Sequence, residues 1–237
     1  MVTQTLGLQI LSELEKCFST PAASIALVKD EAKAPQKVSG DIVFPSSNIL
    51  GIPDLLLTHQ QEELIIPCLP YGKTALSRME GILHFYVDDT RFDPSLWVNP
   101  NKVTKTQCSA FVEPNYTLSL DSPLSWVVWS TYKKRWLARY WQQLGYKVIV
   151  DLNVPTEFYP LSLMGVPKGW RSYATRGYPT RIESLEREHA LAVEHAGTDN
   201  IFFLVYGGER KIWALCKERG WQWLASEDQR SRGVIYG

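Results

Sequence analysis

Three aspartates stand at the ends of short apolar runs, where carboxylates from different runs could act together. Asp88 and Asp89 follow the run at 82–87. Asp151 stands at the end of the run at 147–152. Carboxylate oxygens brought to one place can bind Mg²⁺ or Mn²⁺, or serve as general acid and base. The three residues are therefore the predicted catalytic and metal-binding positions. Whether the protein is an enzyme stays open; if it is, the predicted chemistry is metal-assisted phosphoryl transfer or hydrolysis.

The same aspartates also have a purely local interpretation. Aspartate is common after strands because its side chain can bond the backbone two residues on and so form a turn. If Asp88, Asp89 and Asp151 all do this, no shared site follows from them. The sequence leaves both interpretations open.

Other polar residues, most of them within or just after apolar runs and one just before the next helical stretch, are predicted to bind a ligand beside these carboxylates. They are His84, Asn115, Asp121 and Arg176. A histidine inside an apolar run is also a common core residue whose ring nitrogens are satisfied by the protein. For His84 this second interpretation stays open as well.

No acidic residue occurs between Asp121 and Asp151, although the stretch is rich in basic and aromatic side chains. Cations interleaved with aromatic rings are typical of surfaces that bind single-stranded nucleic acid, because bases stack and phosphates need cations. Arg135, Arg139 and Trp141 are therefore predicted nucleic-acid contacts. A buried helix with its rings in the core would give the same pattern.

Lys134 constrains this stretch further. On a helical projection the apolar residues form one arc, and Lys134 falls inside it. A cation at such a position must either extend to water or pair with a carboxylate. The sequence therefore predicts that Lys134, if it is buried, pairs with one of the carboxylates at the strand ends.

The elements that must position these residues are short runs, each apolar at consecutive positions. They lie at 64–69, 82–87, 108–112, 147–152, 170–174, 201–206 and 221–224. Runs of this kind are typical of strands that are buried on both faces. Helical stretches at 123–144, 181–196 and 208–219 separate the later ones. The predicted fold class is therefore α/β, with mainly parallel strands alternating with helices. We favour a barrel-like form, similar to an incomplete TIM barrel, over an open sheet; in both, the strand ends meet at one rim.

The N-terminal part of the chain lacks this alternation. Residues 5–18 carry apolar side chains at four-residue spacing and predict an amphipathic helix. Residues 19–48 mix prolines with charges and predict a loop with one short strand at 24–28. We therefore expect an N-terminal helix and loop extension at 1–48 and an α/β domain at 49–237.

Composition narrows the functional classes. Lys plus Arg and Asp plus Glu number 25 each, which excludes a protein that coats nucleic acid with its whole surface. The four cysteines have neither zinc-ligand spacing nor the pattern of a disulfide framework. No apolar run approaches the roughly 18 residues of a membrane span. We therefore expect a cytoplasmic protein with no membrane partner.

Several motifs in fixed order carry a resemblance to a known family. They are the run HFYVDD at 84–89 with Phe92, Trp97 and Pro100 after it, the segments at 114–118 and 121–123, the set Tyr132, Arg135, Tyr140, Trp141 and Gly145, and the turn at 51–53. Over roughly residues 50–228, this pattern resembles the bacterial and phage family known as domain of unknown function 4417. The resemblance implies occurrence in phages, plasmids and integrated elements, and it supplies no activity.

The chain departs from the family pattern at two places in the predicted site. The family usually has Asp where this chain has Asn115, which removes one charge. Farther along, the family tends to have Pro and later Trp where this chain has Val150, Asp151 and Asn153. A metal bound at this rim in relatives would be held less tightly here, unless Asp151 compensates.

Three functional hypotheses follow. The first is a mobile-element protein that binds or acts on nucleic acid, with a divalent-metal carboxylate site at the rim. The second is a non-catalytic scaffold whose partner is another protein, and the third is an enzyme acting on a small metabolite. The sequence indicates no oligomeric state.

Overall fold

The computed structural model describes residues 42–72, 75–231 and 233. The helix predicted at 5–18 and the strand predicted at 24–28 lie outside these residues, and the domain boundary after residue 48 stays a prediction. Seven strands form one sheet: β1 (Cys68–Pro70), β2 (Glu80–His84), β3 (Gln107–Val112), β4 (Lys147–Asp151), β5 (Ser172–Arg176), β6 (Phe202–Tyr206) and β7 (Gln222–Leu224). Each of the seven predicted runs overlaps one of these strands.

The helices follow the predicted alternation. They are α2 (Asp93–Val98), α3 (Leu124–Gln143), α4 (Tyr159–Ser162), α5 (Ile182–Ala196), α6 (Glu209–Arg219) and α7 (Glu227–Ser231). Short 3₁₀ helices lie at Leu57–His59, Leu76–Arg78, Asp89–Arg91, Pro100–Lys105 and Thr156–Phe158. The helices predicted at 123–144, 181–196 and 208–219 are confirmed to within one residue at each end. None of the described helices is long and apolar enough to cross a membrane.

The sheet is parallel throughout and curls into an almost closed ring. Each strand pairs with the next in chain order, from β1 to β7. One buried cluster contains side chains from every strand, including Cys68 of β1 and Leu224 of β7 at the two edges. Only a strongly curved sheet brings both edges to the same interior cluster. The predicted α/β, barrel-like form is confirmed.

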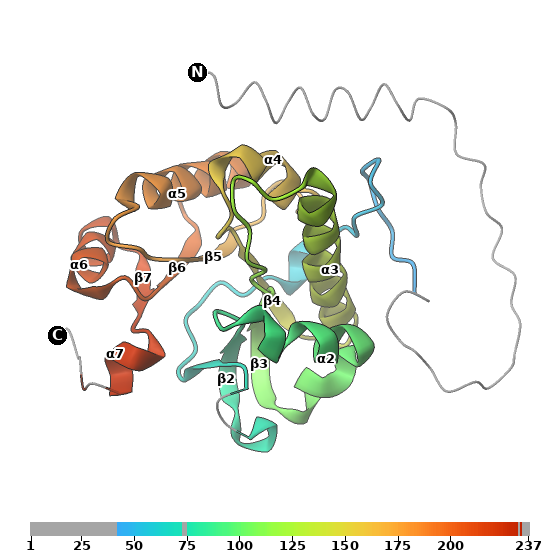
Figure 1. Cartoon of the computed structure of the whole chain (residues 1–237), viewed down its shortest axis with the longest axis horizontal. Helices are drawn as coiled ribbons and strands as arrows, with labels where there is room; N and C mark the ends of the chain where they lie inside the picture. Colours follow the sequence, from blue (N-terminus) through green and yellow to red (C-terminus); the bar gives the residue numbers. More distant parts are fainter. Residues whose placement is uncertain (1–41, 73–74, 232, 234–237) are drawn as a thin grey trace, which may run out of the picture.

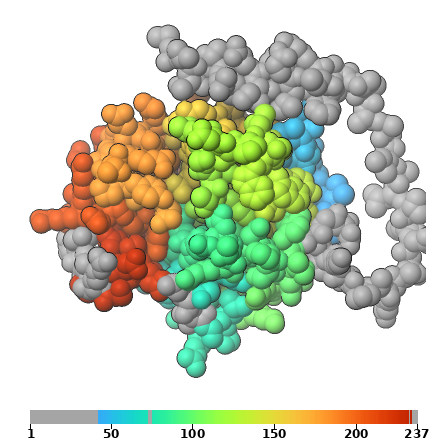
Figure 2. Space-filling model, in the orientation of Figure 1, coloured from blue at the N-terminus to red at the C-terminus, as the bar shows by residue number. Residues whose placement is uncertain are grey.

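Helices lie around the outside of the strands, with α3, α5 and α6 on successive sides (Figure 1). The space-filling view shows that the green segments around α2 and the orange and red segments from α5 onward adjoin in one continuous surface (Figure 2). Two further clusters, built around Trp136 and Trp170, fill the space between the outer face of the sheet and these helices. The strand ends are therefore held by packing on both faces.

Gly81 allows the first two strands to meet closely. Its φ is +77°, a backbone conformation that L side chains rarely adopt. A Cβ atom there would come within 2.1 Å of the carbonyl oxygen of Pro67. The ladder also shifts register between Gly81 and Ile82. This irregularity lies within β2, two residues before His84.

Candidate functional site

The strand ends that carry the predicted site lie side by side. β2, β3 and β4 are consecutive parallel neighbours in the sheet. The residues that follow them, near 88, 115 and 151, therefore leave the sheet at the same edge. The shared rim on which the sequence-based site depends is present.

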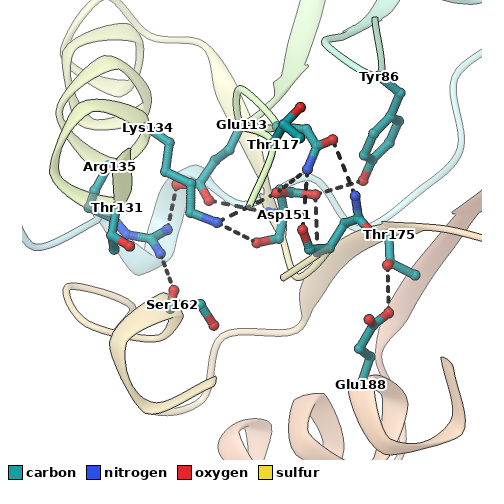
Figure 3. Close-up of polar contacts among 12 residues, drawn as sticks. Tyr86, Glu113, Thr117, Thr131, Lys134, Arg135, Asp151, Ser162, Thr175 and Glu188 are labelled. Atoms are coloured by element: carbon teal, nitrogen blue, oxygen red, sulfur yellow. Dashed lines mark hydrogen bonds and ion pairs between the residues drawn. The ribbon is translucent and has the colours of Figure 1, made fainter. Parts of the chain in front are cut away.

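Asp151 is the centre of a buried polar network at this rim (Figure 3). Its carboxylate is fully buried and accepts hydrogen bonds from the Tyr86 hydroxyl at 3.1 Å and from the Asn115 amide at 3.2 Å. The ammonium of Lys134 lies 3.5 Å from one carboxylate oxygen and donates to the Asp151 carbonyl at 2.9 Å. Three different strand ends and α3 thus converge on one carboxylate. The predicted pairing of a buried Lys134 with a strand-end carboxylate is present.

A second buried ion pair supports the first. Glu113, which follows β3, accepts a hydrogen bond from the Asp151 backbone N–H at 3.2 Å. The guanidinium of Arg135 pairs with the other Glu113 oxygen, and both side chains are fully buried. Arg135 also donates to the carbonyls of Ser162 at 2.6 Å and Met164 at 3.0 Å. Every charge in this layer therefore has a partner, as burial requires.

Glu188 of α5 adds a third buried carboxyl close to the network. It accepts a hydrogen bond from the Thr175 hydroxyl of β5 at 2.5 Å. Burial raises the pKa of Glu188 from its ordinary 4.5 to about 8, and the nearby Asp151 charge acts in the same direction. Buried groups with strongly shifted pKa values cluster at functional sites, although ion-pair networks in the core shift them too.

A pocket of about 460 Å³ opens at the ends of β2, β5, β6 and β7. Its lining includes Tyr86, Arg91, Arg176, Tyr178, Tyr206 and Asp228. Tyr86 belongs both to the pocket wall and to the Asp151 network. Tyr86 therefore links the pocket wall to the central carboxylate.

The structure places the two aspartates after β2 away from Asp151. Asp88 is exposed and accepts hydrogen bonds from the Thr90 hydroxyl at 2.5 Å and the Thr90 N–H at 2.9 Å, which lower its pKa. Asp89 accepts from the N–H of Thr117 at 2.8 Å, and burial raises its pKa. Across residues 42–231, apart from the undescribed 73–74, no three His, Cys, Asp or Glu side chains come together as a metal ion would need. Asp88 thus takes the local turn-forming role, and the three predicted ligands do not assemble.

The basic residues of α3 point inward. Lys133 is buried and donates to Asp93 at 2.7 Å, beside the buried pairs that Lys134 and Arg135 form. Trp141 is fully buried, and its indole N–H donates to the Pro100 carbonyl at 3.1 Å. In this conformation Arg135 and Trp141 are part of the core. The alternative interpretation, a buried helix with its rings in the core, therefore describes the second half of α3, whereas Trp126 and Trp129 in the first half are exposed.

The remaining predicted residues lie in different surroundings. Asn115 belongs to the Asp151 network, and Arg176 and Asp88 line the pocket. His84 is fully buried behind the pocket, whereas Asp121 is exposed in the turn before α3. Arg139 is half-buried, with its guanidinium 5.0 Å from the ring centre of Phe44. The residues predicted from the sequence therefore include part of the Asp151 network and part of the pocket lining, together with several residues that belong to neither.

Sequence reasoning did not select Tyr86, Tyr206 or Glu188. A signal for Tyr86 was present: it stands two and four residues after His84 and Ile82, and alternate residues of a strand share one face. Tyr206 carries the same signal, since it stands two and four residues after Leu204 and Phe202 of its strand. Glu188 stands in the middle of a helix that is rich in charged residues, where the sequence does not distinguish a buried carboxyl from an exposed one.

Comparison with known proteins places this site in a wider group. A family model described as "Domain of unknown function (DUF4417)" matches residues 44–175, which is more than half of the 237 residues. A "Gene 1 protein" of Mycobacterium phage D29 is 31% identical over 132 residues, covering 54% of this chain and 48% of the relative. A "Gene 1 protein" of Mycobacterium phage L5 is 29% identical over 132 residues, covering 54% of this chain and 57% of the relative. The chain thus spans about half the length of the curated relatives it matches. No solved structure matches significantly.

Proposed function

The chain belongs to the DUF4417 family, and from that premise we propose that it is a mobile-element protein that binds a nucleotide unit in the rim pocket. The unit is either a free nucleotide or one nucleotide of a nucleic-acid strand, since both present the same phosphate and base. The phage origin of the two relatives supports the mobile-element setting.

The observation that carries this proposal is the lining of the pocket. Arg91 and Arg176 both line it, and guanidinium groups bind phosphate oxygens through paired hydrogen bonds. Tyr178 lies beside Arg176, whose guanidinium is 5.4 Å from the ring centre, and tyrosine rings stack on bases. The volume of about 460 Å³ falls within the usual range of about 300–1,000 Å³ for small-molecule sites.

Carboxylates in the same lining fit the other parts of such a ligand. Asp88, Glu209 and Asp228 line the pocket together with the two arginines. Carboxylates accept hydrogen bonds from the amino groups of bases. They also hold Mg²⁺, which is commonly bound through one or two carboxylates and the phosphates of the ligand. A lining with both positive and negative side chains suits a nucleotide, which has an anionic phosphate and hydrogen-bond donors on its base, better than it suits a simple anion.

Tyr86 offers a route from binding to chemistry. Its hydroxyl donates to the buried Asp151, while its ring forms part of the pocket wall. Burial, followed by the charge of Asp151, raises the pKa of Tyr86 well above its ordinary range, so the phenol keeps its proton at neutral pH. A phenol that donates to a carboxylate can take a proton from a ligand hydroxyl or water while it passes its own proton to the carboxylate, so the pair would act together as a general base. We therefore assign any acid–base step to Tyr86 and Asp151.

Replacing Arg176 with glutamine tests the binding step. We expect Arg176→Gln to weaken the binding of nucleoside phosphates by about tenfold or more, because a charge-assisted hydrogen bond is lost. Isothermal titration calorimetry with nucleoside mono- and triphosphates, with and without Mg²⁺, measures this change. Single-stranded oligonucleotides form a second arm that separates the free nucleotide from the strand.

Arg187→Gln is the matched control for this measurement. Arg187 lies on α5 outside the pocket, and its exposed guanidinium is 3.8 Å from Glu183. The control should bind every ligand as the wild-type protein does. If the wild-type protein binds neither nucleotides nor oligonucleotides, the proposed function is wrong. A response to other polar metabolites would then favour the small-molecule enzyme.

A further inference from the structure

His84 has a buried N–H group without an acceptor. The side chain is fully buried at the end of β2, and its Nδ1 accepts a hydrogen bond from the Tyr86 backbone N–H at 3.3 Å. In a neutral imidazole the other nitrogen then carries the proton. Nε2 has no hydrogen-bond partner among the described residues. Buried donors in native proteins nearly always have a partner, so an acceptor beyond the described residues is expected here.

The position of His84 relates this donor to the rim pocket. Its ring centre lies 4.5 Å from that of Tyr206 and 5.6 Å from that of Tyr86. These two tyrosines line the pocket and stack on each other with ring centres 5.3 Å apart. His84 therefore stands directly behind the tyrosine wall of the pocket, inside the mouth of the ring of strands.

The electrostatic surroundings of His84 favour a negatively charged acceptor. Burial lowers the pKa of His84, and the positive charges of Arg230 and Arg176 act in the same direction, so that together they bring it to about 3. The imidazole is therefore neutral at physiological pH and can still donate one hydrogen bond. A neutral donor with two guanidinium groups nearby suits an anion, because the anion gains the field of both cations without displacing a carboxylate partner.

Tyr206 is the side chain whose displacement exposes this donor most readily. Its hydroxyl accepts one hydrogen bond, from the backbone N–H of Glu227 at the start of the five-residue helix α7. Tyr86 is tied instead to the buried Asp151 network. A shift of Tyr206 with α7 would open the wall, whereas a shift of Tyr86 would break a bond to a buried charge.

We propose that a phosphate group of the ligand enters the mouth of the ring beside Arg176 and accepts a hydrogen bond from Nε2 of His84. This inference deepens the proposed function and rests on its pocket. It orients a nucleotide with its phosphate inward and its base outward, against Tyr178. Tyr206 moves aside as the phosphate enters.

His84→Phe is the decisive substitution, because phenylalanine keeps a ring against Tyr206 and removes the Nε2–H donor, together with the Nδ1 acceptor of the Tyr86 N–H. We expect the affinity for inorganic phosphate and for nucleoside monophosphates to fall by about tenfold or more, the usual effect of losing a hydrogen bond to a charged group. Nucleosides without phosphate should bind unchanged. His189→Phe is the matched control, since His189 packs against Phe203 and Trp221 away from the pocket.

Nitrogen NMR gives a second measurement that needs only the folded wild-type protein. The chain contains four histidines, so four imidazole signal sets are expected. The Nε2 signal of His84 should move on addition of inorganic phosphate, while the signals of the other histidines stay in place. His84→Phe identifies the signal by its disappearance, and substitution of the other three identifies it by elimination if that variant does not fold.

The outcomes separate this inference from the proposed function. If His84→Phe and the wild type bind nucleotides with equal affinity and the Nε2 signal does not move, the inference is overturned and the proposed function stands. In that case a buried water is the hydrogen-bond partner of His84. If phosphate binding depends on His84 but no nucleotide binds, the inference stands and the proposed function falls. If neither phosphate nor nucleotide binds, both are overturned.

Discussion

Replacing Arg135 with methionine is expected to lower the free energy of unfolding by about 3–5 kcal/mol, the usual cost of removing one partner from a buried ion pair. Arg135 is fully buried and is the charge partner of the equally buried Glu113. It also donates to the carbonyls of Ser162 and Met164. The substitution therefore leaves a carboxylate without its cation and two carbonyls without a donor, in a place that water does not reach.

Urea unfolding followed by tryptophan fluorescence measures this loss, and Arg171→Met is its control. Arg171 forms an ion pair with Glu62 at 2.7 Å, but both side chains are more than a third exposed. Exposed pairs contribute about 0–1 kcal/mol, so the control should unfold almost as the wild type does. Adding Glu113→Gln to Arg135→Met should recover part of the loss, because the unpaired charge is gone. Equal effects at positions 135 and 171 would show that the inner pair carries no special weight.

The second large effect concerns the pH dependence of stability, which we assign to Glu188. Its pKa is about 8 in the folded protein against an ordinary 4.5. Below pH 4.5 the carboxyl is protonated in both states, and the favourable contribution of its burial is complete. As the pH rises from 4.5 to 8, the unfolded state ionises first, so the free energy of unfolding falls by up to about 1.4 kcal/mol per pH unit. Above pH 8 both states are ionised and the decline stops.

Glu188→Gln removes this titration and keeps a hydrogen-bonding group beside Thr175. We expect the variant to become progressively more stable than the wild type between pH 4.5 and pH 8, with a difference of a few kcal/mol at the upper end. His84 acts with the opposite sign: its pKa is lowered to about 3, so its contribution is lost as the pH falls below 6.5. The difference between variant and wild type isolates Glu188 from this background.

Glu183→Gln, on the same helix, provides the comparison for the pH series. The Glu183 side chain is 89% exposed, so its substitution should leave the pH profile of the wild type in place. Denaturant unfolding at half-unit pH steps gives all three profiles. A constant difference between Glu188→Gln and wild type across the range would mean that Glu188 is ionised throughout and that burial does not hold its proton.

Local sequence patterns predicted most of the fold because the strands are buried on both faces. Consecutive apolar residues located β4 and β6 almost to the residue. The run at 170–174 was placed two residues early, since Trp170 precedes β5 and its indole N–H donates to the Ser172 carbonyl instead of entering the ladder. The run at 64–69 gave only the three-residue β1, which follows Pro67.

The candidate site could be predicted where burial of one charged residue requires a partner of opposite charge. A cation in the apolar arc of a helix must extend to water or pair with a carboxylate, and this requirement links a buried Lys134 to a strand-end carboxylate from the sequence alone. The pocket had no such signal. It forms because the sheet curls and brings the end of β6, with Tyr206, next to the end of β2, with Tyr86. A contact between residues 120 positions apart in the chain leaves no trace in either local pattern.

The edges of the sheet give the pocket an adjustable mouth. In the described part of the chain β1 bonds only to β2 and β7 only to β6. A side-chain hydrogen bond links the two edges: Arg230 of α7 donates to the Cys68 carbonyl at 3.3 Å. A fully closed barrel would have to break backbone hydrogen bonds between two strands in order to widen. Here the hydrogen bond between the edges comes from one guanidinium on a short helix. The mouth can therefore widen for a ligand while the hydrogen bonds between strands stay intact, and the hydrogen bond that is lost is that of Arg230.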